Sequence, residues 1–359
     1  MARKCRVLSA VLLMAAGGFM THYLPVLTQA AGAVIHEEAT AVGVTPELFL
    51  SSGFGEDFTE ETESTEVFFP SEGEIITPSP DAGPKPYPTK WDLTGGTVEK
   101  MSYGRYSGTQ YFDLRTCGQV RNETSHANEE LYDESLHKPD FTIARTTVPQ
   151  VLIMHTHTTE CFEPYERDAY DANFNYRTTD PALNICRVGD AIAEQLENAG
   201  IGVIHDTTIH DYPSYTGSYE RSRRTVQAIL DAHPSIKVVL DIHRDAIGGN
   251  GVIKQPTVRI DGKKAAQVMI ISGCDDGTMG MPDYMKNFRF ACMLQQQMES
   301  DYEGLTRPIL FDYRHYNQDM TTGSLLIEVG THGNTLEQVV YSGELIGKSL
   351  SRTLIRLED

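Results

Sequence analysis

Three apolar runs in the second half of the chain end at residues suited to metal or acid–base chemistry. They are VLIMHTHTTE at Val151–Glu160, VVLDIHRDA at Val238–Ala246 and SLLIEVG at Ser324–Gly330. Continuous apolar runs rich in β-branched residues are typical of buried parallel strands. Ligands of open α/β sheets bind just beyond the carboxyl ends of such strands. The pattern therefore predicts that residues far apart in sequence meet at one sheet edge.

The segments around these runs alternate between helical and strand-like spacing of apolar residues. Helices are predicted at Asn184–Ala199, Ser218–Ala232, Phe288–Tyr302 and Leu336–Ile355, and further strands at Ile201–Ile204 and Val268–Ser272. Strands separated by helices imply right-handed crossovers. We therefore expect an α/β fold with a mostly parallel open sheet, helices on both faces, and a zinc site at the C-terminal strand edge.

The first part of the chain has a different composition. Arg3, Lys4 and Arg6 precede the apolar run Val7–Leu27, which is typical of an export signal or a membrane anchor. We interpret residues 1–32 as a cytoplasmic stub with a retained anchor, with cleavage near Ala33 as the alternative. Residues 33–94 are rich in Glu, Asp, Ser, Thr and Pro and are predicted to be a disordered linker.

The remaining chain divides into two predicted parts. Residues 95–149 are expected to extend the N-terminal side of a catalytic domain at 150–359, with Leu114–Cys117 as an edge strand. The net charge of −20 argues against nucleic acid as a partner and against electrostatic docking on anionic lipid. The cysteines show no CxxC spacing, so free thiols are expected, with one disulfide as the alternative.

Several motifs together resemble the stage II sporulation protein P family of endospore-forming bacteria. They are HTHTTECF, NICRVGDAIAEQLENAGIGV, TGSYERSR, DIHRDA, GLTRPI, YNQD and LLIEVGTHGNTLEQ, in that order between Gln150 and Arg356. The resemblance implies a zinc N-acetylmuramoyl-L-alanine amidase of the amidase 3 type, also associated with peptide cross-link cleavage. It further implies remodelling of septal peptidoglycan during engulfment, from the cell membrane into the intermembrane space. The implied partners are a lytic transglycosylase and other engulfment membrane proteins. Cys161 and His332 depart from the family pattern.

Catalytic zinc is held by about three protein ligands from His and carboxylate groups, which leave one position open. His157 and His243 are the predicted nitrogen ligands, and both resemble the strand-end histidines of the amidases. The third ligand stays open. Glu160, three residues after His157, is favoured because its loop can turn back toward the ion. His155 and Asp180 are the alternatives, and His155 also fits a buried supporting role.

The other candidate residues have supporting or substrate-binding roles. Glu328 is the predicted general base, because a carboxylate that ends an apolar strand is partly desolvated and has a raised pKa. Asp245 is expected to orient a metal ligand by a hydrogen bond. Arg244 is assigned either to stem-peptide carboxylates or to a structural role. Asn317 and Gln318 are assigned either to glycan or peptide binding or, for the asparagine, to a turn.

The predicted activity is amide hydrolysis between N-acetylmuramic acid and L-alanine. Two alternatives use the same fold. One is a catalytically silent protein that binds peptidoglycan and supports septal assembly, and the other is a zinc peptidase that cuts only stem peptides. Polar residues at all three strand ends favour catalysis over the silent alternative.

Overall fold

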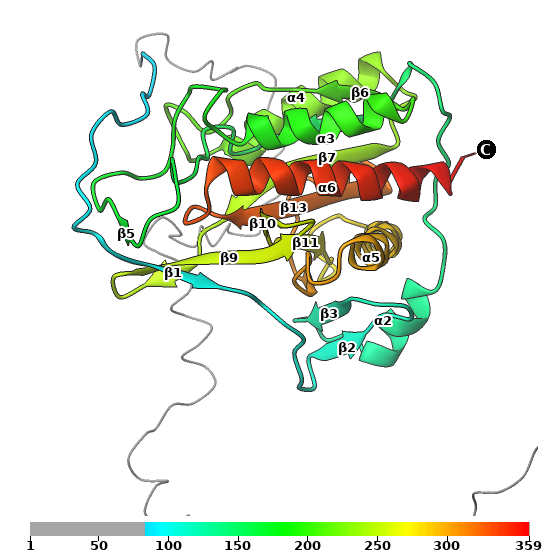
Figure 1. Ribbon diagram of the computed structural model, residues 1–359. Coiled ribbons are helices and arrows are strands. Elements are labelled where there is room, and N and C mark those ends of the chain that lie inside the picture. The colour runs from blue at the N-terminus through cyan, green and yellow to red at the C-terminus, as the bar shows by residue number, and fades with distance from the viewer. Residues whose placement is uncertain (1–82, 359) are drawn as a thin grey trace, which may run out of the picture. The chain divides into compact units, whose positions relative to one another are not determined.

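The computed structural model describes residues 83–358 (Figure 1). The predicted stub, the anchor and most of the predicted linker lie outside these residues. Among residues 83–358, none of the helices combines the length and the apolar character needed to cross a membrane. The cysteines in this part of the chain are all free thiols, as expected.

An eight-stranded mixed sheet forms the centre of the molecule. Its order is β2 (Tyr111–Asp113), β3 (Gln119–Asn122), β12 (Ile309–Asp312), β11 (Val268–Gly273), β13 (Gly323–Thr331), β7 (Val238–Asp245), β4 (Pro149–Met154), β6 (Gly202–His205). Pairing is parallel except between β2 and β3 and between β11 and β13. The sheet therefore reverses direction at β11, while the three predicted site strands β13, β7 and β4 run parallel and side by side.

Helices cover both faces of this sheet. They are α2 (Asn128–Ser135), α3 (Cys186–Asn198), α4 (Ser218–Ala232), α5 (Tyr284–Asp301) and α6 (Leu336–Ile355). Side chains of a strand alternate between faces. Val151 and Ile153 of β4 share a buried cluster with α3, α5 and α6, whereas Leu152 and Met154 pack with Val226 of α4. The predicted α/β class with helices on both faces is thus observed (Figure 1).

Helix α6 begins and packs in ways that its sequence encodes. The Thr335 hydroxyl accepts a hydrogen bond from the Gln338 backbone N–H at 3.3 Å. In turn, the Gln338 side-chain oxygen accepts a hydrogen bond from the Thr335 backbone N–H. This capping box satisfies N–H groups that a helix start otherwise leaves unpaired. At Gly343 an added Cβ would lie 2.9 Å from the Val188 carbonyl oxygen, so a glycine allows the close approach of α6 to α3.

A second sheet of five strands was not predicted. It consists of β10 (Lys263–Ala266), β9 (Val252–Ile260), β1 (Gly96–Met101) and β5 (Ala169–Tyr170) in that order, with β8 (Gly248–Gly249) paired to β9. β1 lies parallel to β9, more than a hundred residues away along the chain. Because β9 is only half buried and its partner is distant, its sequence carries little local strand signal.

Residues 95–149 contribute strands to both sheets. β1 belongs to the second sheet, and β2 and β3 lie at the edge of the main sheet. The expected edge strand at Leu114–Cys117 is wrong, because this segment is the turn between β2 and β3, closed by a hydrogen bond from Leu114 N–H to the Gly118 carbonyl. The edge strand is instead Tyr111–Asp113.

The end of the predicted linker is packed on the domain. The Tyr87 hydroxyl donates to the Phe162 carbonyl at 2.6 Å, and the rings of Tyr87, Trp91 and Phe174 meet edge to face. The Lys85 N–H donates to the Thr179 hydroxyl at 2.9 Å. The prediction of disorder across residues 33–94 is therefore wrong for residues 85–92, because two aromatic side chains in this polar segment bury against the domain.

Candidate functional site

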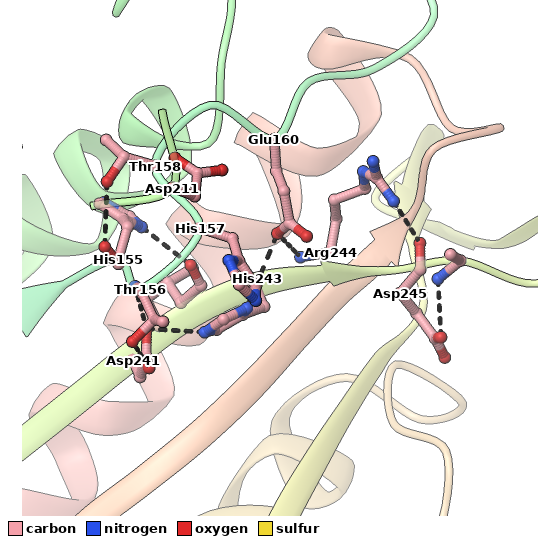
Figure 2. A network of polar contacts seen from close by, with 12 residues as sticks. His155, Thr156, His157, Thr158, Glu160, Asp211, Asp241, His243, Arg244 and Asp245 are labelled. Carbon is pink, nitrogen blue, oxygen red and sulfur yellow. Dashed lines mark hydrogen bonds and ion pairs between the residues drawn. The ribbon is translucent and has the colours of Figure 1, made fainter. Parts of the chain in front are cut away.

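The carboxyl ends of β4, β7 and β13 bring the predicted site residues together. Glu328 on β13 is the register partner of His243 on β7, and Met154, which ends β4, pairs with Asp241. The turn after β4 carries His157 and Glu160. Figure 2 shows the side chains of His157, Glu160 and His243 converging from this turn and from β7.

His157 presents one nitrogen to the site and has the other occupied. Its Nδ1 is buried and has no hydrogen-bond partner, while its Nε2 lies 3.0 Å from the Tyr215 hydroxyl. The Tyr215 ring stacks on the imidazole at a centroid distance of 4.5 Å. Burial, followed by the nearby His243, holds the pKa of His157 well below its usual value. His157 is therefore neutral, which is the form of imidazole that binds metals.

His243 differs from His157 in having a carboxylate partner. Its Nε2 lies 2.7 Å from Asp241 Oδ1, and its Nδ1 lies 3.7 Å from Glu160 Oε2. Burial alone would lower the pKa of His243, but the Asp241 carboxylate outweighs burial and raises it to about 9. The ring stands perpendicular to that of His157, with 5.2 Å between centroids. His157 Nε2 thus contacts the Tyr215 hydroxyl, whereas His243 Nε2 lies at ion-pair distance from Asp241 without a hydrogen bond. With its raised pKa His243 is protonated near neutral pH, so zinc binding would release a proton from it.

Glu160 turns back toward these histidines, as its spacing predicted. Its backbone N–H donates to the His157 carbonyl at 3.0 Å, and its carbonyl accepts from Ile185, next to the start of α3. The buried carboxylate accepts a hydrogen bond from the Arg244 backbone N–H at 3.0 Å and lies 3.8 Å from Arg177 Nη2. Local turn geometry and a β-bridge between Glu160 and Arg177 hold this carboxylate at the site.

Glu328 is a partly buried residue beside these donors, and its Oε2 atom is shielded from solvent. Its Oε2 has no hydrogen-bond partner among the described residues. Burial, followed by the charge of Asp245, raises the pKa of Glu328 to about 8, although His243 opposes the shift. A carboxyl group with a pKa in this range can both accept and release a proton near neutral pH.

The two alternative ligands are engaged elsewhere. His155 Nδ1 donates to the Ile242 carbonyl at 2.8 Å, and its Nε2 lies 2.9 Å from His205 Nε2. Burial and the neighbouring His205 lower the pKa of His155 to about 3, so the ring is neutral and both of its nitrogens are occupied. Asp180 is exposed and accepts a hydrogen bond from the Ala182 N–H at 2.9 Å. His155 therefore has no spare nitrogen, and Asp180 lies in an exposed turn.

The hypothesis that Asp245 orients a metal ligand is wrong in this structure. Its Oδ2 pairs with Arg307 Nη1 at 2.6 Å, and its Oδ1 accepts from the Ala246 N–H. The charge of Arg307 draws this carboxylate away from the imidazoles. Asp241 takes the predicted place instead, and it also accepts hydrogen bonds from the Thr156 N–H and hydroxyl at 2.8 Å and 2.7 Å.

The three predicted substrate-binding side chains have internal partners. Arg244 is buried and donates to the backbone carbonyls of Tyr176 and Asp245. The Gln318 amide is buried and bridges the Gly273 N–H and the Ile271 carbonyl of β11. Asn317 has a φ of 53° and donates to the Tyr219 carbonyl and the Ser222 hydroxyl. These contacts support the structural alternative for the three residues, although Arg244 Nε has no partner among the described residues. Their assignment to substrate binding stays a prediction.

Several residues that line the site were missed from the sequence. Arg177 Nη1 pairs with Asp211 Oδ2 at 2.6 Å, and Asp211 also accepts hydrogen bonds from the Thr159 N–H and hydroxyl. Arg177 lies over the Tyr215 ring at 4.9 Å. These residues come from loops without periodicity, so no sequence signal pointed to them. Asp241 was findable, because it precedes His243 by two and so shares its strand face.

The donor atoms of the site fit a metal ion. Within residues 83–358, no three His, Cys, Asp or Glu side chains stand at the spacing of a metal cluster. A buried His157 Nδ1 without a partner, the His243 Nδ1 and the Glu160 carboxylate nevertheless supply the nitrogen and oxygen donors that zinc uses. Two imidazoles and one carboxylate would leave one zinc position open.

A profile described as "Stage II sporulation protein P (SpoIIP)" matches residues 107–351, which include every residue of the candidate site. The chain belongs to the stage II sporulation protein P family. Stage II sporulation protein P of Bacillus subtilis is 30% identical over 200 residues, which cover 53% of this chain and 47% of that protein. The matched part therefore spans about half of that relative, and the predicted family resemblance is confirmed.

Solved structures give weaker likenesses. N-acetylmuramoyl-L-alanine amidase AmiC2 of Nostoc punctiforme is 10% identical, with a TM-score of 0.34, covering 59% of this chain and 97% of that one. An N-acetylmuramoyl-L-alanine amidase from Clostridium difficile 630 is 16% identical with the same TM-score and coverages. These low scores do not identify the activity of this chain.

Proposed function

We propose that this family member is a zinc-dependent peptidoglycan hydrolase, an N-acetylmuramoyl-L-alanine amidase that remodels septal cell wall during engulfment, with cross-link cleavage as a second activity. The observation that carries the proposal is the convergence of His157, Glu160 and His243 (Figure 2). The partly buried Glu328 lies beside them as the register partner of His243. Membership of a sporulation protein family supports the cellular setting.

The zinc would be held by His157 Nδ1, His243 Nδ1 and the Glu160 carboxylate. A zinc ion contributes Lewis acidity, which lowers the pKa of water and polarises a carbonyl oxygen. Tyr215 and Asp241 hold the two imidazoles through their Nε2 atoms and thereby leave Nδ1 as the donor. This arrangement follows the general rule that an outer partner fixes the tautomer and orientation of a ligating histidine.

Glu328 moves the proton that amide hydrolysis requires. In its ionised form it accepts a proton from the attacking water, and the oxygen of that water forms the new bond to the lactyl carbonyl carbon. Glu328 then delivers the proton to the amine of L-alanine as the C–N bond breaks. A pKa of about 8 suits both steps, because near neutral pH Glu328 can then gain and lose the proton at a similar free-energy cost.

Metal analysis and product analysis test the proposal together. The purified chain should contain about one zinc ion and should lose cleavage activity on treatment with a chelator. Mass spectrometry of digested peptidoglycan should find free stem peptides that begin with L-alanine and glycan strands that lack them. Full activity after verified metal removal would contradict zinc dependence. Peptide fragments with every muramyl amide intact would indicate the stem-peptide peptidase instead, and no product would indicate the silent alternative.

The cellular placement rests on residues outside the described part of the chain. We expect residues 1–32 to anchor the protein in the cell membrane, with the catalytic domain in the septal intermembrane space beside a lytic transglycosylase and other engulfment proteins. Cell fractionation should recover full-length protein with the membrane. Protein found in the medium with an N-terminus near Ala33 would show that the segment is a cleaved signal.

A further inference from the structure

Three tyrosines stand in a row that runs from the segment after β1 to the first residue of β2. The ring centroids of Tyr103 and Tyr106 are 6.4 Å apart, and those of Tyr106 and Tyr111 are 5.1 Å apart with nearly parallel planes. Tyr106 is 37% exposed. We call Tyr103, Tyr106 and Tyr111 the tyrosine row. The role proposed above for the metal donors and Glu328 does not use these residues.

Buried glutamines hold the backbone of the row in place. The Gln119 side chain accepts from the Tyr106 N–H at 2.8 Å and donates to the Tyr106 carbonyl at 3.0 Å. Gln267 makes the same pair of bonds to Tyr103, at 2.6 Å and 2.9 Å. Each side-chain amide thus makes the pair of backbone hydrogen bonds that a neighbouring strand would otherwise make. The exposed ring of Tyr106 is therefore presented by a fixed backbone, which lowers the entropy that binding would cost.

The row begins beside the candidate site. Arg307 lies over the Tyr103 ring at 4.9 Å and pairs with Asp245 at 2.6 Å. Asp245 ends β7, and its charge acts on Glu328. Gln267, which holds Tyr103, precedes β11 at the point where Val268 pairs with Val329 of β13. A polymer with one unit at the site could therefore extend along the row.

The charges beside the row are balanced. Arg105 pairs with Asp113 at 2.5 Å, and Arg121, the register partner of Tyr111, pairs with Glu123 at 2.6 Å. Arg307 has Asp245 as its partner. A ligand rich in carboxylates, such as a stem peptide, would need cations without such partners. A row of aromatic rings whose charged neighbours are all paired suits an uncharged ligand that has both apolar C–H faces and hydroxyl groups.

We infer that the tyrosine row is a binding site for the glycan strand of peptidoglycan. The inference rests on the proposed function, because that function places glycan at the site. The C–H face of a sugar ring packs on the negative face of an aromatic ring. The row positions the strand so that the muramyl unit to be cleaved lies next to Glu328.

A binding measurement with a cleavage-deficient parent tests the row. Full-length Glu328→Gln protein is titrated with purified glycan strands stripped of stem peptides. In that background Tyr106→Ala should bind about tenfold more weakly, and Tyr106→Phe, which keeps the ring, should bind within about twofold of the parent. Tyr165→Ala is the matched control, since Tyr165 is 54% exposed and lies outside the row. It should not change binding. Tyr111→Ala serves as a second variant and should also weaken binding.

The outcomes separate this inference from the proposed function. Unchanged binding by folded Tyr106→Ala, or an equal loss in Tyr165→Ala, would overturn the row as a glycan site. Binding that needs the stem peptides would also overturn it, because the ligand would then be the peptide. If wild-type protein binds the stripped strands through Tyr106 but releases no product from intact peptidoglycan, the hydrolase proposal fails and the row stands.

Discussion

Asp241 Oδ1 lies 2.7 Å from Nε2 of His243, which follows it by two residues on β7. The other imidazole nitrogen, Nδ1, lies 3.7 Å from the Glu160 carboxylate. Asp241 is itself fixed by two hydrogen bonds from Thr156, the residue just before His157. One buried carboxylate therefore ties the strand that carries one predicted ligand to the turn that carries another.

Replacing Asp241 should weaken zinc binding. Asp241→Asn removes the negative charge that orients His243, and we expect zinc affinity to fall by ~10–100-fold. Competition with a zinc-binding dye measures the change. Asp245→Asn is the matched control on the same strand, because that carboxylate pairs with Arg307 and should leave affinity within about twofold. Equal affinity of Asp241→Asn and wild type would contradict this role.

Replacing Glu328 should separate metal binding from turnover. Glu328→Gln keeps the shape of the side chain but cannot accept the proton, so cleavage should fall by ~10²-fold or more. Zinc content should stay at about one ion per chain, since Glu328 is not among the proposed ligands. Rates come from released stem peptides and zinc content from elemental analysis. Wild-type turnover by a folded, zinc-loaded variant would remove Glu328 from the mechanism.

The third ligand can be assigned by comparing two carboxylates. Glu160→Gln should lower zinc affinity, because the carboxylate lies beside His243 and an amide oxygen is a weaker zinc ligand. Asp180→Asn should leave affinity unchanged, since this exposed residue caps a turn. Zinc titration of both variants gives the answer. Unaltered occupancy in Glu160→Gln would move the third ligand to His155 or Asp180.

The segment before β1 should contribute measurably to stability. Trp91 packs against Tyr87 and Phe174, and the Arg167 guanidinium lies 4.3 Å from its ring centroid. Trp91→Ala should lower the free energy of unfolding by about 1–3 kcal/mol. Urea denaturation measures this change. Leu93→Ala, at a side chain that is 42% exposed, is the control and should change it by less than about 0.5 kcal/mol. Equal effects of the two changes would show that the aromatic contacts contribute little.

Much of the central sheet was determined by the sequence alone. The runs at Val151, Val238 and Ser324 became the neighbouring strands β4, β7 and β13, and the predicted helices match α3, α4, α5 and α6 closely. Periodicity and turn residues are local signals, so they predict helices and strands without any knowledge of the residues that these elements pack against. The largest shift is at α5, which begins at Tyr284 and not at Phe288. Strand ends also showed which histidines and carboxylates would meet.

Only the tertiary structure decided how those groups are oriented and supported. Thr156 and Asp241 are 85 residues apart, and His157 and Tyr215 are 58 apart, yet each pair forms a hydrogen bond. The first pair joins the turn after β4 to the neighbouring strand β7, and the second joins the same turn to the loop before α4. No local pattern encodes either contact. Asp245 does not have its predicted role for the same reason, because its partner Arg307 comes from a segment that is distant in sequence. Sequence determined which residues end the strands, and long-range packing determined which atoms of those residues remain available for chemistry.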